Sequence, residues 1–93
     1  MNYYFKTDSG NFRSGDINDY NVCQEYAEDA CLRYHEIVRV FSISDGVSDM
    51  EGYWMYLDEG KTVYIEGCFL DPKEVWRQYD LRRKRKTDEV FIA

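Results

Sequence analysis

Small and apolar side chains recur with a helical period in the first third of the chain. Their spacings of three, four and seven residues are typical of the buried face of an amphipathic helix. The recurring positions are Cys23, Tyr26, Ala27, Ala30, Cys31 and Tyr34. We therefore predict a helix from about Asp19 to Glu36, with Asn18 or Asp19 as the capping residue.

Segments rich in β-branched and aromatic residues flank this helix and predict strands. A turn cluster at 8–11 separates the first strand from a short return strand at Phe12-Arg13, and a loop follows Ser44. The Asp58-Glu59-Gly60-Lys61 sequence favours a tight hairpin, because glycine accepts a positive φ. The four main predicted strands are Asn2–Thr7, Ile37–Ser44, Tyr53–Leu57 and Thr62–Glu66.

A second helix is predicted to begin at Asp71, with Pro72 in its first turn and Glu74 at its third position. Its expected buried stripe is Val75, Trp76 and Tyr79. The predicted order is β-β-α-β-β-β-α, with residues 88–93 as either a last strand or a tail. The economical packing is an α+β fold, in which an antiparallel sheet of about four strands is covered on one face by two helices. Residues 1–93 form one predicted domain, with a basic helix end and tail at 82–93.

Charge divides the chain into an acidic body and a basic segment. Residues 1–80 hold seven basic and sixteen acidic residues, a net −9, whereas residues 81–93 have a net +3. An acidic body repels the phosphates of nucleic acids and attracts basic protein surfaces. The alternative interpretation is that this charge only keeps the protein soluble.

The outer face of the first predicted helix is the main candidate binding surface. Carboxylates fixed along a helix can register against a basic groove built for phosphates, and nearby rings can supply apolar anchors. We expect a partner protein complex with a basic surface. The candidate residues are Glu25, Glu28, Asp29, Leu32 and Glu36 on the helix, Asp58 and Glu59 in the hairpin, and the rings of Trp54, Tyr56 and Tyr64.

The basic run has three interpretations that the sequence leaves open. It consists of Arg82, Arg83, Lys84, Arg85 and Lys86. Such a run is typical of a solvated helix end, where positive charge complements the helix dipole. It could instead dock on the acidic body of a second copy, giving a homodimer, or bind nucleic acid as a small regulator.

Candidate chemistry is sparse, and we predict no catalytic residue, metal site or cofactor. The only histidine, His35, stands four residues after Cys31, which lies on the apolar stripe where a thiol stays inert. A small metal protein or enzyme using Cys31, His35 and Cys68 is the further alternative. Cys23 and Cys31 would lie about 12 Å apart along a helix, too far for a disulfide.

The sequence also predicts where the protein works. We find neither a signal peptide nor an apolar run long enough for a membrane span, and free thiols suit a reducing compartment. We therefore expect a cytoplasmic protein with no membrane contact.

This profile resembles the small acidic inhibitors of bacterial defence that phages encode, the anti-CRISPR and antirestriction proteins. The residues that carry the resemblance are the helical acids Glu25, Glu28, Asp29 and Glu36, together with the hairpin Tyr53–Glu66. The resemblance covers the overall profile and no shared motif. It implies a non-enzymatic inhibitor of a CRISPR effector or restriction enzyme, acting in a bacterial host as a mimic of nucleic acid. The basic run departs from this pattern, because a pure mimic would not need it.

Overall fold

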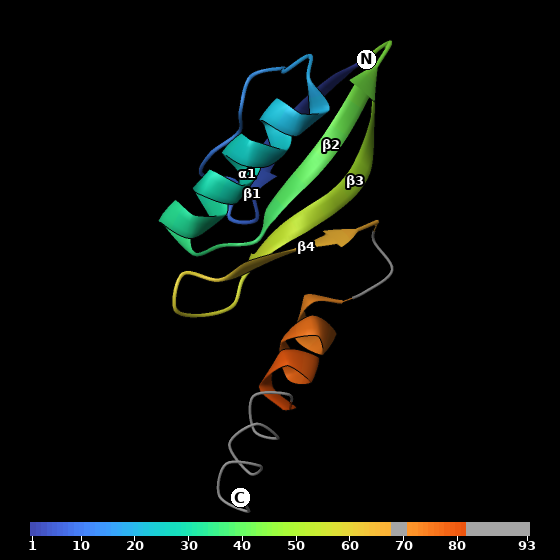
Figure 1. The fold of residues 1–93 in the computed structure, drawn as a ribbon. Helices are drawn as coiled ribbons and strands as arrows, with labels where there is room; N and C mark the ends of the chain where they lie inside the picture. The colour runs from blue at the N-terminus through green and yellow to red at the C-terminus, as the bar shows by residue number, and fades with distance from the viewer. Residues whose placement is uncertain (68–70, 82–93) are drawn as a thin grey trace, which may run out of the picture.

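A computed structural model describes residues 1–67 and 71–81 (Figure 1). Within these ranges the chain forms a four-stranded antiparallel sheet and two helices, which confirms the predicted α+β class. The elements are β1 (Asn2–Thr7), α1 (Tyr20–Tyr34), β2 (Val38–Ser44), β3 (Val47–Tyr56), β4 (Thr62–Glu66) and a helix over 72–81. The predicted bounds of β1 and β4 are confirmed, and those of α1 and β2 differ by at most two residues.

The sheet has the order β1-β2-β3-β4, so β2, β3 and β4 form a meander. Asp45 and Gly46, with φ of 51° and 79°, make the two-residue turn between β2 and β3. Such a turn matches the twist of the strands it joins. The predicted loop after Ser44 is therefore wrong, because β3 begins at Val47 and pairs along the whole of β2.

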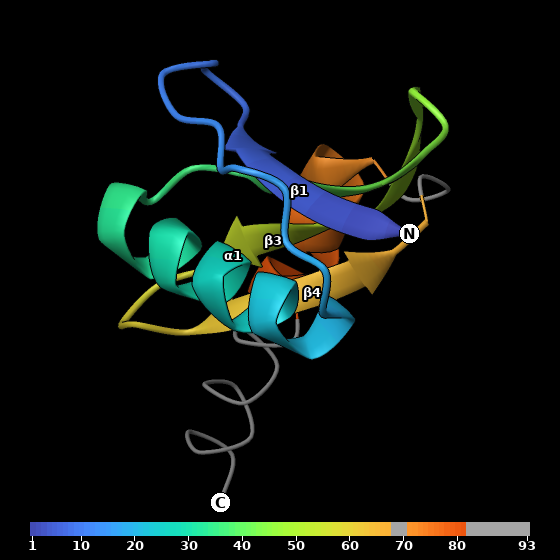
Figure 2. The ribbon, with the colours of Figure 1, turned by 90° about the horizontal axis from the view of Figure 1, so that it is seen from above.

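Helix α1 lies across one face of the sheet (Figure 2). Asp19 is its N-cap, since its Oδ1 accepts a hydrogen bond of 3.1 Å from the Val22 backbone N–H. The helix ends at His35, which adopts a left-handed conformation at φ 54°. Small residues face the sheet, where Phe5, Val38 and Val40 complete the buried core. The buried helical positions are Cys23, Ala27, Ala30 and Cys31.

Two positions of the predicted buried stripe are exposed, which corrects that prediction. The side chains of Tyr26 and Tyr34 are 58% and 44% exposed. The sheet already presents large rings beneath α1, including those of Trp54 and Tyr64, so only small helical residues fit between them. The two tyrosines lie instead on the flank of α1 that faces residues 12–17.

Residues 8–19 return along the outer edge of β1 without forming a strand. Lys6 pairs with Arg13 and Tyr3 with Ile17, each as an isolated bridge. The prediction of a return strand at 12–13 is therefore wrong, although those residues lie where the strand was expected. The buried Ser14 side chain accepts a 2.9 Å hydrogen bond from the Phe5 N–H, which ties the segment to the sheet.

The second helix begins after Asp71, whose carboxylate accepts a hydrogen bond of 2.8 Å from the Lys73 N–H. It does not lie beside α1 but beyond the β4 side of the sheet (Figure 1). The Tyr79 hydroxyl donates a 2.7 Å hydrogen bond to Asp58 in the β3–β4 turn. Val75 and Tyr79 are half-buried, but Trp76 is exposed, which corrects the predicted stripe. The basic run and the segment 88–93 lie outside the described residues.

Candidate functional site

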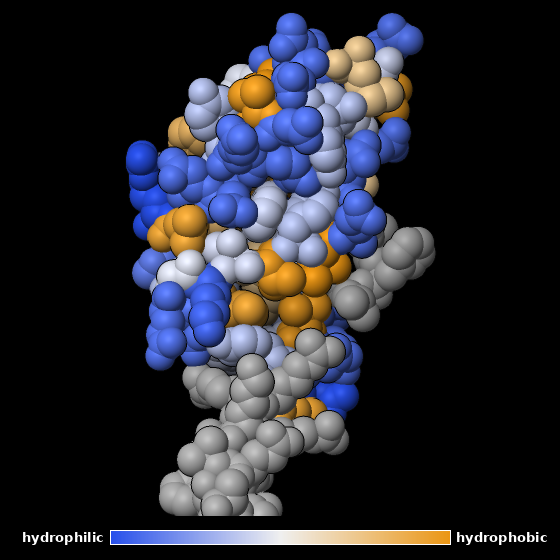
Figure 3. Space-filling view, in the orientation of Figure 1, coloured by the Kyte–Doolittle hydropathy of each residue, from blue (hydrophilic) through white to orange (hydrophobic). Residues whose placement is uncertain are grey.

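A shallow hollow on the β4 side of α1 contains the first predicted carboxylates. Asn21, Gln24, Glu25 and Glu28 line it from the helix, and Trp54 lines it from β3. We call these five residues the acidic flank. At 100° per residue, Gln24 and Glu28 project toward β4, whereas Glu25 is closer to the crest of the helix. The molecular face that carries α1 is largely hydrophilic in Figure 3.

The two carboxylates of the acidic flank lack ion-pair partners among the described residues. Glu25 is exposed and Glu28 is half-buried. The nearest cation along the helix, Arg33, contacts Asp29 instead, at 3.9 Å. Because an unpaired carboxylate keeps its field, this part of α1 presents negative potential to a partner.

The other predicted acids do not continue this surface as a single strip. Asp29 faces Arg33 on the opposite flank, and Glu36 lies beyond the helix end, where it accepts a 3.0 Å hydrogen bond from the Ser9 N–H. Leu32 is half-buried among these acids. The uninterrupted acidic face is therefore reduced to Glu25 and Glu28.

A polar chain of side chains supports the acidic flank from below. The Trp54 indole N–H donates to Gln24 Oε1 at 2.8 Å, and Gln24 Nε2 donates to the Tyr20 hydroxyl at 2.8 Å. The Trp54 ring also contacts Tyr64, with centroids 5.2 Å apart. Burial raises the pKa of Tyr64 well above its usual value. Trp54 is thus fixed by packing and hydrogen bonds rather than presented freely.

Tyr64 fits only because residue 52 is glycine. A methyl group added at Gly52 would lie 2.5 Å from the Tyr64 hydroxyl oxygen and closer still to the Ile65 carbonyl oxygen. The bulge in β3 lies next to this position, at Glu51, because Val40 pairs with Gly52 and Phe41 pairs with Met50. Gly52 therefore determines how β4 and its rings approach α1.

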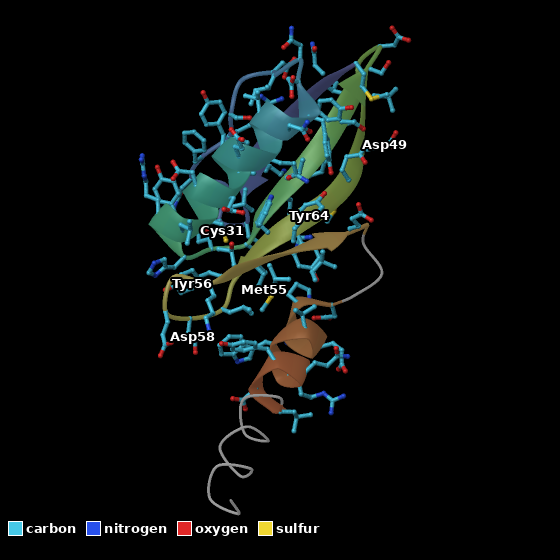
Figure 4. The ribbon with its side chains drawn as sticks, viewed as in Figure 1. Cys31, Asp49, Met55, Tyr56, Asp58 and Tyr64 are labelled. Atoms are coloured by element: carbon cyan, nitrogen blue, oxygen red, sulfur yellow. The ribbon has the colours of Figure 1, made fainter. Side chains whose placement is uncertain are left out.

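Of the two hairpin acids, Figure 4 labels Asp58, which lies near the C-terminal end of α1. Asp58 is half-buried and accepts the hydrogen bond from Tyr79, whereas Glu59 is exposed. Tyr56 does not point to solvent as a free anchor, because its ring stacks on His35 with centroids 3.9 Å apart. This end of the molecule is thus a closed cluster of side-chain contacts, and Glu59 is its one exposed predicted acid.

Cys31 and His35 do not form a nucleophilic pair. Burial, with a smaller contribution from the charge of Glu28, raises the pKa of the Cys31 thiol to about 11. A thiol with this pKa is protonated at neutral pH. Cys23 and Cys31 are free and buried, as predicted. No group of metal-ligating side chains occurs in the part of the chain that the structure describes, and Cys68 lies outside it.

Sequence reasoning missed the supporting residues Tyr20, Asn21 and Gln24. Their only signal was position, since Tyr20 and Gln24 are four apart on a helix and both are polar. The hydrogen bond to Trp54 depends on how α1 packs on the sheet.

A scan of protein-family models and searches of curated proteins and of solved structures found no match to this chain. Neither described helix is long and apolar enough to cross a membrane.

Proposed function

We propose that the protein is a non-enzymatic inhibitor that docks its acidic flank on a basic, nucleic-acid-handling protein complex in the bacterial cytoplasm. The observation that carries this proposal is the pair Glu25 and Glu28, which have no ion-pair partner within residues 1–67 and 71–81 and lie on a packed helix beside the fixed indole of Trp54. The resemblance to anti-CRISPR and antirestriction proteins suggests a CRISPR effector or a restriction enzyme as the target.

Two carboxylates bind better when their spacing is fixed before binding. The packed helix fixes the spacing of Glu25 and Glu28, so little conformational entropy is lost when they enter a groove that normally binds phosphates. Trp54 adds a half-buried apolar surface at the base of the hollow, and the Gln24 hydrogen bond holds it in place. An inhibitor that binds in this way occupies the groove and so prevents nucleic acid from binding there, without a chemical step.

The test is displacement of labelled duplex DNA from purified complexes of both classes. The variant Glu25→Gln/Glu28→Gln removes two charges and keeps the side-chain shape. Its matched control, Asp45→Asn/Asp49→Asn, removes two carboxylates at the other end of the sheet, where Figure 4 places Asp49. Asparagine also tolerates the positive φ of residue 45.

We expect the Glu25/Glu28 variant to displace DNA about tenfold less well, a difference of about 1.4 kcal/mol, with a weaker dependence on salt. The control should stay within about twofold of the wild type. Equal potency of the wild type and a folded Glu25/Glu28 variant would overturn the proposal, as would failure to displace DNA from any complex of either class.

A further inference from the structure

A second cleft lies on the opposite flank of α1, between the helix and residues 12–17. Its volume is about 300 Å³. The apolar walls are Phe5, Phe12, Ile17, Tyr26, Ala30 and Tyr34. We call it the aromatic cleft. Phe12, Tyr26 and Tyr34 are each at least 40% exposed there, although rings of this size usually bury most of their surface.

The rings are arranged as an open series rather than as a closed core. The ring centroids of Phe5 and Phe12 are 5.8 Å apart, and those of Phe12 and Tyr34 are 6.1 Å apart. These spacings are typical of favourable tilted aromatic contacts. Tyr26 stands on the helix across the cleft, so a ring entering it would contact Tyr26 while extending the series.

The size of the cleft limits what it can hold. At about 300 Å³ it stands at the lower limit for small-molecule sites, too small for a nucleotide cofactor. The cleft has room for one large aromatic side chain. An aromatic anchor in a pocket is also the feature that concentrates binding energy at protein interfaces.

The charges at the rim indicate what should stand beside that anchor. Asp29 and Arg33 are 3.9 Å apart and their side chains are each 69% exposed, so the pair is weak and solvated. The Asp29 carboxylate therefore remains available to a cation from outside. Glu25 of the acidic flank lies near the crest of the same helix, so the negative field continues from Asp29 to that flank.

We propose that the aromatic cleft receives a tryptophan, tyrosine or phenylalanine side chain of the partner protein, next to a lysine or arginine that meets Asp29. This inference rests on the proposed function, because it makes the same basic partner hold α1 from both flanks. The acidic flank then contributes charge and register, and the aromatic cleft contributes the desolvated anchor that charge alone lacks.

The test uses the peptide Ac-Lys-Trp-Lys-NH₂ as the probe and isotope-labelled protein in an NMR titration. We expect amide shifts in residues 12–17 and 26–34 that saturate at millimolar peptide. Ac-Lys-Gly-Lys-NH₂ has the same charge and should bind about fivefold more weakly, without shifts at Phe12. Equal shifts from both peptides, or shifts elsewhere only, would overturn the inference.

Variants locate the site. Tyr26→Ala removes an exposed ring, so the fold should persist while the preference for tryptophan over glycine is lost. Trp76→Ala removes another exposed ring, from the second helix, and should leave that preference intact. A preserved preference in folded Tyr26→Ala, or its loss in Trp76→Ala, would contradict the assignment. Since no partner complex is used, this result is independent of the DNA-displacement test.

Discussion

The two flanks of α1 differ in chemistry although they belong to one helix. The acidic flank holds carboxylates that form no ion pair with any residue the structure describes, over a hydrogen-bonded support from the sheet. The aromatic cleft holds exposed rings over a segment without regular secondary structure. Because cysteines and alanines occupy the face toward the sheet, the charged and bulky residues of α1 are displaced to its sides. A helix that buries only small residues can thus present two separate surfaces.

Among the substitutions that distinguish the two flanks, Gly52→Ala should have the largest effect on stability. The added methyl group would collide with Tyr64 and the Ile65 backbone, so β4 must shift, and we expect a loss of about 3 kcal/mol in unfolding free energy. Gly15→Ala is the control. Gly15 lines the aromatic cleft and has open space around it, so its stability should change by less than about 0.5 kcal/mol. Urea denaturation measures both, and similar losses would refute the asymmetry.

A smaller effect should follow from Gln24→Leu, which removes the link between Trp54 and Tyr20. The indole N–H and the tyrosine hydroxyl would lose their partner, at a cost of about 1–2 kcal/mol. The shift of the Trp54 indole proton in NMR spectra should move, while amides around the aromatic cleft keep their positions. Asn21→Leu, an exposed change on the same flank, serves as the control. An unmoved indole signal would contradict the role of Gln24.

The smallest effect is the pH dependence of the unfolding free energy that the buried thiols on the sheet-facing side of α1 produce. Burial raises the pKa of both Cys23 and Cys31 to about 11, and Glu28 adds to the shift of Cys31. The folded state holds these protons more tightly than the unfolded state, so this stabilisation is complete below about pH 9 and is lost as the pH rises through 11. We expect each thiol to account for about 1 kcal/mol of the decline between pH 8 and pH 10.

Alanine variants isolate the two thiols. Unfolding free energies at both pH values should show a shallower decline for Cys23→Ala and Cys31→Ala than for the wild type. Glu28→Gln should reduce the decline only slightly, because burial is the main cause at Cys31. A decline unchanged by both cysteine substitutions would show that other groups produce it.

The sequence predicted elements with clear local signals and missed those set by tertiary packing. The periodicity of α1 and the aromatic and β-branched residues of β1 and β4 were sufficient to place those elements. The first half of β3 was missed because Ser48, Asp49 and Glu51 interrupt its apolar pattern, and a bulge breaks its alternation. Pairing with β2 makes it a strand.

The candidate site was predicted only in part, again because local sequence patterns do not specify tertiary contacts. Glu25 and Glu28 project outward as helical periodicity requires. The interaction of Asp29 with Arg33 follows the i,i+4 spacing of α1 and could have been predicted from the sequence. The hydrogen bond from Ser9 to Glu36 and the exposure of Tyr26 depend instead on what lies beside α1. No spacing rule within one helix contains that information.

The bridges between β1 and residues 12–17 give this segment a double role. It covers the outer backbone edge of β1, through hydrogen bonds such as the mutual pair between Tyr3 and Ile17 at 2.7 Å. Exposed strand edges invite pairing with other chains, so this cover protects against aggregation. The same residues form one wall of the aromatic cleft. A side chain that enters the cleft therefore contacts the segment that covers the edge of β1. Binding in the cleft and protection of that edge depend on the same residues.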